Sequence, residues 1–122
     1  MIKNKKILIV GAGGFIGGHL VKKLLNNGNT IVACDIKPKE LWFQEFDKAK
    51  NFYSMDMKDI SNCRKVTNNI NYVFNMACNM GGMGFIENNK AECMQSVLIN
   101  TNLLIACKED KVEKYFFSSS AC

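Results

Sequence analysis

Residues 6–28, KILIVGAGGFIGGHLVKKLLNNG, decide the fold of this protein. An apolar run, Ile7–Val10, is followed by a cluster of glycines and then by a stretch ending at Gly28. In that last stretch four apolar residues recur at helical spacing: Ile16, Leu20, Leu24 and Leu25. A short run without polar residues is typical of a strand covered on both faces, and a glycine just past the apolar positions stops a helix. The stretch therefore predicts a strand, a tight turn and a helix in direct succession.

The turn has the glycine spacing Gly11-x-x-Gly14-x-x-Gly17. In dinucleotide-binding turns the first glycine permits the sharp bend, the second lets the backbone approach a pyrophosphate, and the third lets the helix pack on the strand. The helix then begins near Phe15 and Ile16, where its N–H groups and its dipole face the anion. The alternative is a glycine turn that only packs. The strand before it, the helix after it and an acidic residue further on favour the binding turn.

The rest of the chain alternates between strands and helices. Four further strands are expected, at residues 30–34, 52–55, 72–76 and 115–117. A short helix is expected within 40–50, and another, capped by Asp59 or Ser61, runs to about Asn69. A long amphipathic helix has six residues on its apolar face: Ala91, Met94, Val97, Leu98, Ile105 and Ala106. This alternation predicts one α/β domain over residues 1–122, a Rossmann-type doubly wound parallel sheet that stops after about the fifth strand.

Two acidic residues end expected strands. Asp35 ends the second strand, eighteen positions after Gly17. A carboxylate at that place in a dinucleotide fold accepts hydrogen bonds from the adenosine ribose and repels the 2′-phosphate of NADP, so the cofactor is predicted to be NAD. Asp56 ends the third strand, and with Met57 beside it we expect a contact to the adenine edge. A plain helix-capping role is the alternative for Asp56.

Two further segments follow the fourth strand. Asn75-Met76-Ala77 closes that strand at the carboxyl edge, where ligands bind in such sheets, so Ala77 is a candidate cofactor contact. The segment Gly81-Gly82-x-Gly84 is too rich in glycine for an ordinary helix or strand. It indicates either a backbone that approaches a bulky ligand or a flexible loop.

Composition excludes several other classes of protein. The formal net charge is +5, but the lysines are scattered, so nucleic acid is not an expected partner. The six cysteines form no Cys-x-x-Cys pair and there is one histidine, so no metal site is expected. The amino terminus enters a strand directly, and no segment approaches the ~20 apolar residues of a membrane span. We expect a cytoplasmic protein with reduced thiols and no membrane partner.

The motifs GAGGFIG at 11–17, Asp35, NMA at 75–77 and FFSSSA at 116–121 occur in the order found in a known family. Over its whole length the chain resembles the extended short-chain dehydrogenase/reductases, the NAD-dependent epimerases and dehydratases that modify nucleotide-sugars. The run 79–86, NMGGMGFI, together with Ser119-Ser120-Ala121-Cys122, is similar to the branch of that family that epimerises GDP-mannose at C3 and C5.

The resemblance implies an activity and roles for residues. In that branch, oxidation of the sugar at C4 acidifies the protons at C3 and C5, and a cysteine and a lysine exchange those protons. Cys122 is implied as one acid/base residue, and Ser120 as a hydrogen-bond partner of the oxygen at C4. Gly81 and Ala121, with Ser120 and Cys122, are implied to line the site of a GDP-sugar substrate. The family also implies a homodimer of the full-length protein.

Three departures from the family pattern keep alternatives open. No tyrosine has a lysine four residues on, so the Tyr-x-x-x-Lys pair is absent, and we interpret the chain as an N-terminal fragment that is inactive alone. Ser96–Asn102 differs from the family's Asn-Val-x-Gly-Thr-x-Asn, and Cys78-Asn79 replaces Ala-Asp. A nucleotide-sugar 4-epimerase, a 4,6-dehydratase, or a non-catalytic NAD-binding sensor or regulatory module are the alternatives.

Overall fold

The structure, a computed structural model, describes residues 2–42, 51–77 and 90–117. In chain order, its elements are β1 (Lys6–Val10), α1 (Phe15–Asn26), β2 (Thr30–Asp35), η1 (Lys39–Leu41), β3 (Phe52–Ser54), α2 (Ile60–Val66), β4 (Tyr72–Asn75), α4 (Lys90–Glu109) and β5 (Lys114–Phe117). Each of the five strands predicted from the sequence is present, within one or two residues of its predicted bounds.

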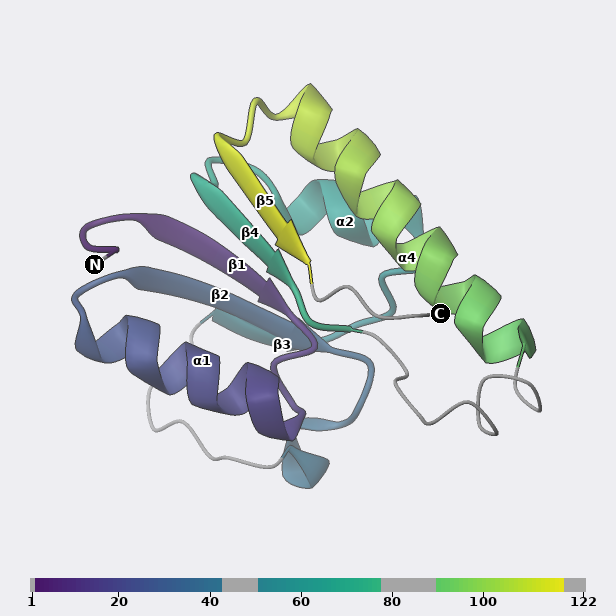
Figure 1. The fold of residues 1–122 in the computed structure, drawn as a ribbon, viewed down its shortest axis with the longest axis horizontal. Coiled ribbons are helices and arrows are strands. Elements are labelled where there is room, and N and C mark those ends of the chain that lie inside the picture. Colours follow the sequence, from purple (N-terminus) through teal and green to yellow (C-terminus); the bar gives the residue numbers. More distant parts are fainter. Residues whose placement is uncertain (1, 43–50, 78–89, 118–122) are drawn as a thin grey trace.

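The strands form one sheet in the order β3-β2-β1-β4-β5, and every neighbouring pair is parallel. Helix α1 covers one face, and α2 and α4 lie on the other (Figure 1). This arrangement confirms the doubly wound Rossmann-type sheet. In the register Val10 lies between Cys34 and Asn75, so β1, β2 and β4 end at nearly the same level. Their carboxyl ends therefore form one edge of the sheet.

The apolar run of β1 is buried on both faces. Ile7 and Ile9 pack in the cluster beneath α1, whereas Leu8 and Val10 pack in the cluster beneath α2 and α4. All four side chains are at most 1% exposed. A central strand of a two-faced parallel sheet has no solvent side, which explains why the sequence shows no alternation there.

Two short helices differ from expectation. Helix α2 begins after Asp59, as predicted, but it ends at Val66 rather than near Asn69. Thr67, at its C-cap, is fully buried and its hydroxyl donates to the Asp110 carboxylate at 2.5 Å, while Asn69 adopts a positive φ of 60° that ends any helix. In place of a helix within 40–50, the described part of that segment has only the 3₁₀ turn η1, and residues 43–50 lie outside the described residues.

The predicted apolar face of α4 is wrong for most of its members. Ala106 is buried, and the side chain of Ala91 lies outside the described part, but the other four are exposed: Met94, Val97, Leu98 and Ile105. The face toward the sheet and α2 instead carries Asn102, Leu103, Ala106 and Cys107, with Ile99 half-buried. The helix has apolar residues on two flanks, so spacing alone does not choose between them.

A smaller correction applies to α1. Its buried residues are Gly17, Gly18, Val21 and Leu24. Ile16 and Leu25, two of the four apolar residues at helical spacing, are exposed, whereas Leu20 is half-buried against the core. Two glycines on the buried face bring the helix axis close to the sheet, which moves the larger apolar residues to its flanks.

Candidate functional site

The glycine turn begins where the ends of three strands meet. Gly11 has a φ of +85°, and its N–H donates to the carbonyl of Cys34 at 2.8 Å. A Cβ there would lie 2.6 Å from the carbonyl carbon of Met76. Gly11 is therefore required both by the backbone conformation and by close contact with the chain that leaves β4.

Gly17 and Gly14 differ in what surrounds them. A Cβ on Gly17 would overlap the carbonyl of Gly11, so Gly17 allows α1 to dock on the turn. Among the described residues, a Cβ on Gly14 would meet only the Gly11 carbonyl oxygen, at 3.6 Å, and Gly14 lines the pocket described below. Packing within this described part of the chain does not require a glycine at position 14. The open space before it suits a group that approaches the backbone, as a pyrophosphate does.

Asp35, at the end of β2, fixes the other side of the turn. One carboxylate oxygen accepts the N–H of Gly13 at 2.9 Å and the other accepts the N–H of Lys37 at 3.0 Å. The two bonds tie the turn to the segment that follows β2. A carboxylate oxygen accepts more than one hydrogen bond, so the group keeps acceptor capacity for a ligand hydroxyl.

Trp42 was not among the residues singled out from the sequence, yet it closes the outside of the turn. Its side chain is 8% exposed, and its indole N–H donates to the Lys37 carbonyl at 2.9 Å. A Cβ on Gly13 would lie 2.7 Å from the indole Cδ1. Gly13, which is not one of the three spaced glycines, is therefore explained by the indole packed on it.

The segment after β3 turns sharply at Asp56–Lys58. The carboxylate of Asp56 accepts the N–H of Lys58 at 2.9 Å, and the Lys58 ammonium lies 3.7 Å from its other oxygen. The same ammonium donates to the side-chain oxygen of Gln95 on α4 at 3.5 Å. Met57 is buried, and its carbonyl accepts the thiol of Cys63 at 3.2 Å. We call residues 56–58 the β3 corner.

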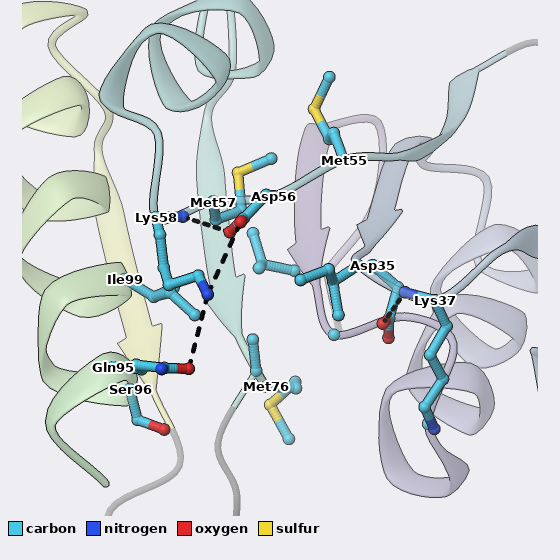
Figure 2. A pocket seen from close by; sticks show the side chains of 15 residues that line it. Asp35, Lys37, Met55, Asp56, Met57, Lys58, Met76, Gln95, Ser96 and Ile99 are labelled. Carbon is cyan, nitrogen blue, oxygen red and sulfur yellow. Dashed lines mark hydrogen bonds and ion pairs between the residues drawn. The ribbon is translucent and has the colours of Figure 1, made fainter. Parts of the chain in front are cut away.

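A pocket of about 290 Å³ opens at this edge of the sheet. It joins six of the predicted cofactor residues: Gly11, Gly14, Asp35, Asp56, Met57 and Ala77. Figure 2 shows Asp35 and Lys37 on one side of it and Gln95, Ser96 and Ile99 of α4 on the opposite side, with the β3 corner between. Ligands of doubly wound sheets bind at this kind of edge.

The α4 residues and Lys58 were missed as pocket residues by sequence reasoning. In the sequence, Ser96 was noted only as the first residue of a stretch that departs from a family motif. In the structure it lines the pocket. No pattern in the sequence indicates that Gln95 and Lys58 meet, because the contact joins residues 37 positions apart.

The remaining predicted residues do not line the pocket or are not described. Phe15 and Ile16 begin α1 with exposed side chains, and Gly17 is buried beneath the turn. A helix leaves the N–H groups of its first turn without helical partners, and here that end adjoins Gly14. Gly81, Ser120, Ala121 and Cys122 lie outside the described residues.

A polar cluster lies beside the pocket at the end of β4. Asn75, 5% exposed, donates to the Tyr115 hydroxyl at 3.1 Å and accepts the N–H of Ala77 at 3.0 Å. Tyr115 in turn donates to the side-chain oxygen of Asn100 at 2.5 Å. Burial raises the pKa of Tyr115, so its hydroxyl stays a donor near neutral pH. The cluster links β4, β5 and α4, and it fixes the backbone that carries Ala77.

Within residues 2–42, 51–77 and 90–117, no three His, Cys, Asp or Glu side chains are placed to hold a metal ion. Across those same ranges, none of the helices combines the length and the apolar character that a membrane crossing requires.

The parallel order of the strands and the position of the glycine turn define a Rossmann-type protein. The model of the NAD dependent epimerase/dehydratase family matches residues 7–122, so the chain belongs to that family.

Among its relatives, the chain is 41% identical over 118 residues to GDP-mannose 3,5-epimerase 1 of Oryza sativa subsp. indica, covering 96% of this chain and 31% of the relative. It is 37% identical over 121 residues to GDP-mannose 3,5-epimerase of Arabidopsis thaliana, covering 98% and 32%. The UDP-glucose 4-epimerase of Haemophilus influenzae is 33% identical over 124 residues, covering 94% and 36%. The chain thus spans about a third of the length of these curated relatives.

Solved structures agree with this placement. MoeE5 in complex with UDP-glucose and NAD has a TM-score of 0.80 and 30% identity, covering 95% of this chain and 36% of that one. A UDP-N-acetylglucosamine 4-epimerase from Methanobrevibacter ruminantium has a TM-score of 0.81 and 25% identity, covering 98% and 39%.

Proposed function

We propose that this pocket binds the adenosine diphosphate half of NAD. The observation that carries the proposal is the open space before Gly14, enclosed between the start of α1 and the carboxylate of Asp35. Gly11, Gly14, Phe15, Ile16 and Gly17 form the turn and helix start that would receive the pyrophosphate. Asp35 would accept the ribose hydroxyls. Support also comes from two similar structures that are complexes with NAD, those of MoeE5 and of the UDP-glucose 4-epimerase of Thermus thermophilus.

The β3 corner would hold the adenine ring. The carbonyl of Asp56 accepts the side-chain amide of Asn62 on α2, at 2.9 Å. In a trans peptide the following N–H points the opposite way, so the N–H of Met57 is directed away from α2. It would donate to a ring nitrogen while the Asp56 carboxylate accepts the exocyclic amine. Ala77 would contact the cofactor from the end of β4.

For the whole protein, we propose the activity of a GDP-mannose 3,5-epimerase that acts through a transient 4-keto sugar. Support comes from the two plant epimerases at 41% and 37% identity and from the residues at 79–86 and 119–122. When bound, NAD supplies reversible oxidation at C4. Cys122 would remove or return a proton, Ser120 would donate a hydrogen bond to the C4 oxygen, and Gly81 and Ala121 would line the site of the GDP-sugar. A UDP-sugar 4-epimerase is the second candidate, because of the 33% identity to the Haemophilus enzyme.

We also propose that the protein is cytoplasmic and acts as a homodimer. Five large apolar side chains of α4 are 42–66% exposed: Met94, Val97, Leu98, Leu104 and Ile105. We call them the α4 stripe. Exposed apolar patches often mark interfaces, and a second copy presents the same stripe about a twofold axis.

Deuterium exchange tests the activity. The whole protein, rather than residues 1–122 alone, is incubated with NAD and GDP-mannose in D₂O, and label at C3 and C5 of the sugar is measured. We expect incorporation in the wild type, and a loss of about 10²–10⁴-fold at one of these carbons in Cys122→Ala, with NAD affinity unchanged. Unchanged incorporation at both carbons in the variant would remove Cys122 from the mechanism.

Cys107→Ala provides the matched control. The Cys107 thiol lies on the buried face of α4, in the core cluster beneath that helix, and burial raises its pKa to about 12, so it stays protonated and cannot act as a base at neutral pH. Its loss should lower the melting temperature and leave exchange by the folded protein near normal. If the wild type exchanges no proton of GDP-mannose but converts a UDP-sugar at C4, the second candidate is correct.

A further inference from the structure

Four polar side chains are buried among the described residues, and they are Asn29, Thr67, Asn75 and Asn102. Three of them have roles already evident in the fold. Asn29 joins the amino-terminal ends of the strands, Thr67 ends α2, and Asn75 belongs to the polar cluster at β4. Asn102 is different, because it connects the middle of α4 to the wall of the pocket.

Asn102 is 8% exposed, and its amide donates to the carbonyl of Lys58 at 2.9 Å. From α2, the amide of Asn62 donates to the carbonyl of Asp56, also at 2.9 Å. The two helices that cover this face therefore each hold one carbonyl of the β3 corner, on either side of Met57. The buried amide of Asn102 would carry a desolvation cost if it lost its partner, and the half-buried amide of Asn62 adds a second hydrogen bond, so both bonds resist rotation of the corner.

Holding these carbonyls determines what the corner presents to the pocket. Fixing the carbonyl of Asp56 also fixes the opposite N–H of Met57. The peptide that carries the Lys58 carbonyl also carries the N–H of Asp59, which donates to the carbonyl of Asp56 at 3.3 Å. At the same turn the Asp56 carboxylate accepts the N–H of Lys58. The donor and the acceptor at the pocket wall are thus adjacent and directed by groups outside the pocket.

We propose that Asn62 and Asn102 are positioning residues that set the orientation of the β3 corner and thereby its selectivity for adenine over other bases. The inference rests on the proposed binding of NAD in this pocket. Neither asparagine lines the pocket, so neither would touch the ligand. Each acts through the backbone of residues 56–58.

The test compares NAD with nicotinamide hypoxanthine dinucleotide, in which a carbonyl replaces the exocyclic amine of adenine. Dissociation constants for both are measured by calorimetry. The wild type should prefer NAD by about tenfold, because the carbonyl would face the Asp56 carboxylate and leave a hydrogen bond unmade. In Asn102→Leu, which keeps similar volume but has no donor, the preference should fall at least about threefold, toward one. Asn62→Ala should shift it in the same direction.

Asn29→Leu is the matched control. Asn29 is 7% exposed and its amide also donates to backbone carbonyls, those of Ile2 and Leu24, but it precedes β2 at the opposite edge of the sheet. This variant should lose stability and keep the wild-type preference. A purely structural role for Asn102 predicts the same result for Asn102→Leu.

The outcomes separate the inference from the function on which it rests. A wild type that fails to bind NAD contradicts the proposed function. A wild type that binds both dinucleotides equally would contradict the recognition of adenine by the β3 corner, and the inference with it. Variants that keep the full preference for NAD would overturn the inference alone. If Asn102→Leu does not fold, the test rests on Asn62→Ala, because Asn62 is only half-buried. An unchanged preference for NAD in that variant then counts against the proposal.

Discussion

At the scale of single residues, Asp35 lines the pocket, and from this position we predict the relative affinity of the protein for NAD and NADP. A 2′-phosphate placed beside this carboxylate would be repelled, so NAD should bind at least ~10-fold more tightly than NADP, equivalent to about 1.4 kcal/mol. Asp35→Asn should reduce the ratio. The change removes the charge and leaves one acceptor oxygen for two backbone donors, the N–H groups of Gly13 and Lys37. Titration of both cofactors against both proteins measures the ratio.

Lys37 provides the complementary variant. It lines the same pocket, and its ammonium group would attract a 2′-phosphate, opposing the effect of Asp35. Lys37→Ala should therefore raise the preference for NAD above that of the wild type. Equal affinity of the wild type for NAD and NADP would contradict the role given to Asp35.

At the scale of elements, α2 depends on its cap. The Asp59 carboxylate accepts both the hydroxyl and the N–H of Ser61, at 2.7 and 2.9 Å, and the hydroxyl bond is the main cause that lowers the pKa of Asp59. A pKa that is lower in the folded state stabilises the fold above the unfolded-state pKa. This stabilisation is lost as the pH falls through the lowered value. Asp59→Ala should reduce the melting temperature by a few degrees at pH 7.

The pH dependence distinguishes the charged cap from other effects of the substitution. The difference in melting temperature between wild type and Asp59→Ala should shrink as the pH is lowered through the acidic range. Asp59→Asn keeps an acceptor that does not titrate, so its melting temperature should vary less with acid than that of the wild type. A constant difference from pH 7 down to pH 2 would mean that the carboxylate does not cap α2.

At the scale of the whole molecule, the α4 stripe predicts assembly. Leu98→Lys places a charge on the stripe at a side chain that is already 45% exposed. The free energy of unfolding of the single chain should therefore change by less than about 0.5 kcal/mol. We expect sedimentation equilibrium to show a dimer for the wild type and a shift to monomer for this variant. Leu25→Lys, on the exposed flank of α1, should leave the assembly unchanged. A monomeric wild type would contradict the homodimer.

Local sequence patterns were enough to predict the succession of strands along the chain, the glycine turn and the acids at the strand ends. Each of these depends on a local pattern. A buried strand is a continuous apolar run, a positive φ requires Gly11, and the ends of parallel strands share one edge. For that reason six of the predicted cofactor residues line one pocket although they come from four segments of the chain. The roles of Gly81, Ser120, Ala121 and Cys122 stay predictions.

The tertiary structure alone decided how α4 lies on the sheet. The helix has apolar residues on two flanks, and the buried flank follows from packing against α2 and the sheet rather than from spacing. The same orientation of α4 produces the contacts of Gln95 with Lys58 and of Asn102 with the β3 corner. These hydrogen bonds join residues 37 and 44 positions apart. No local pattern records such pairs, because their geometry exists only after the sheet has brought the two segments together.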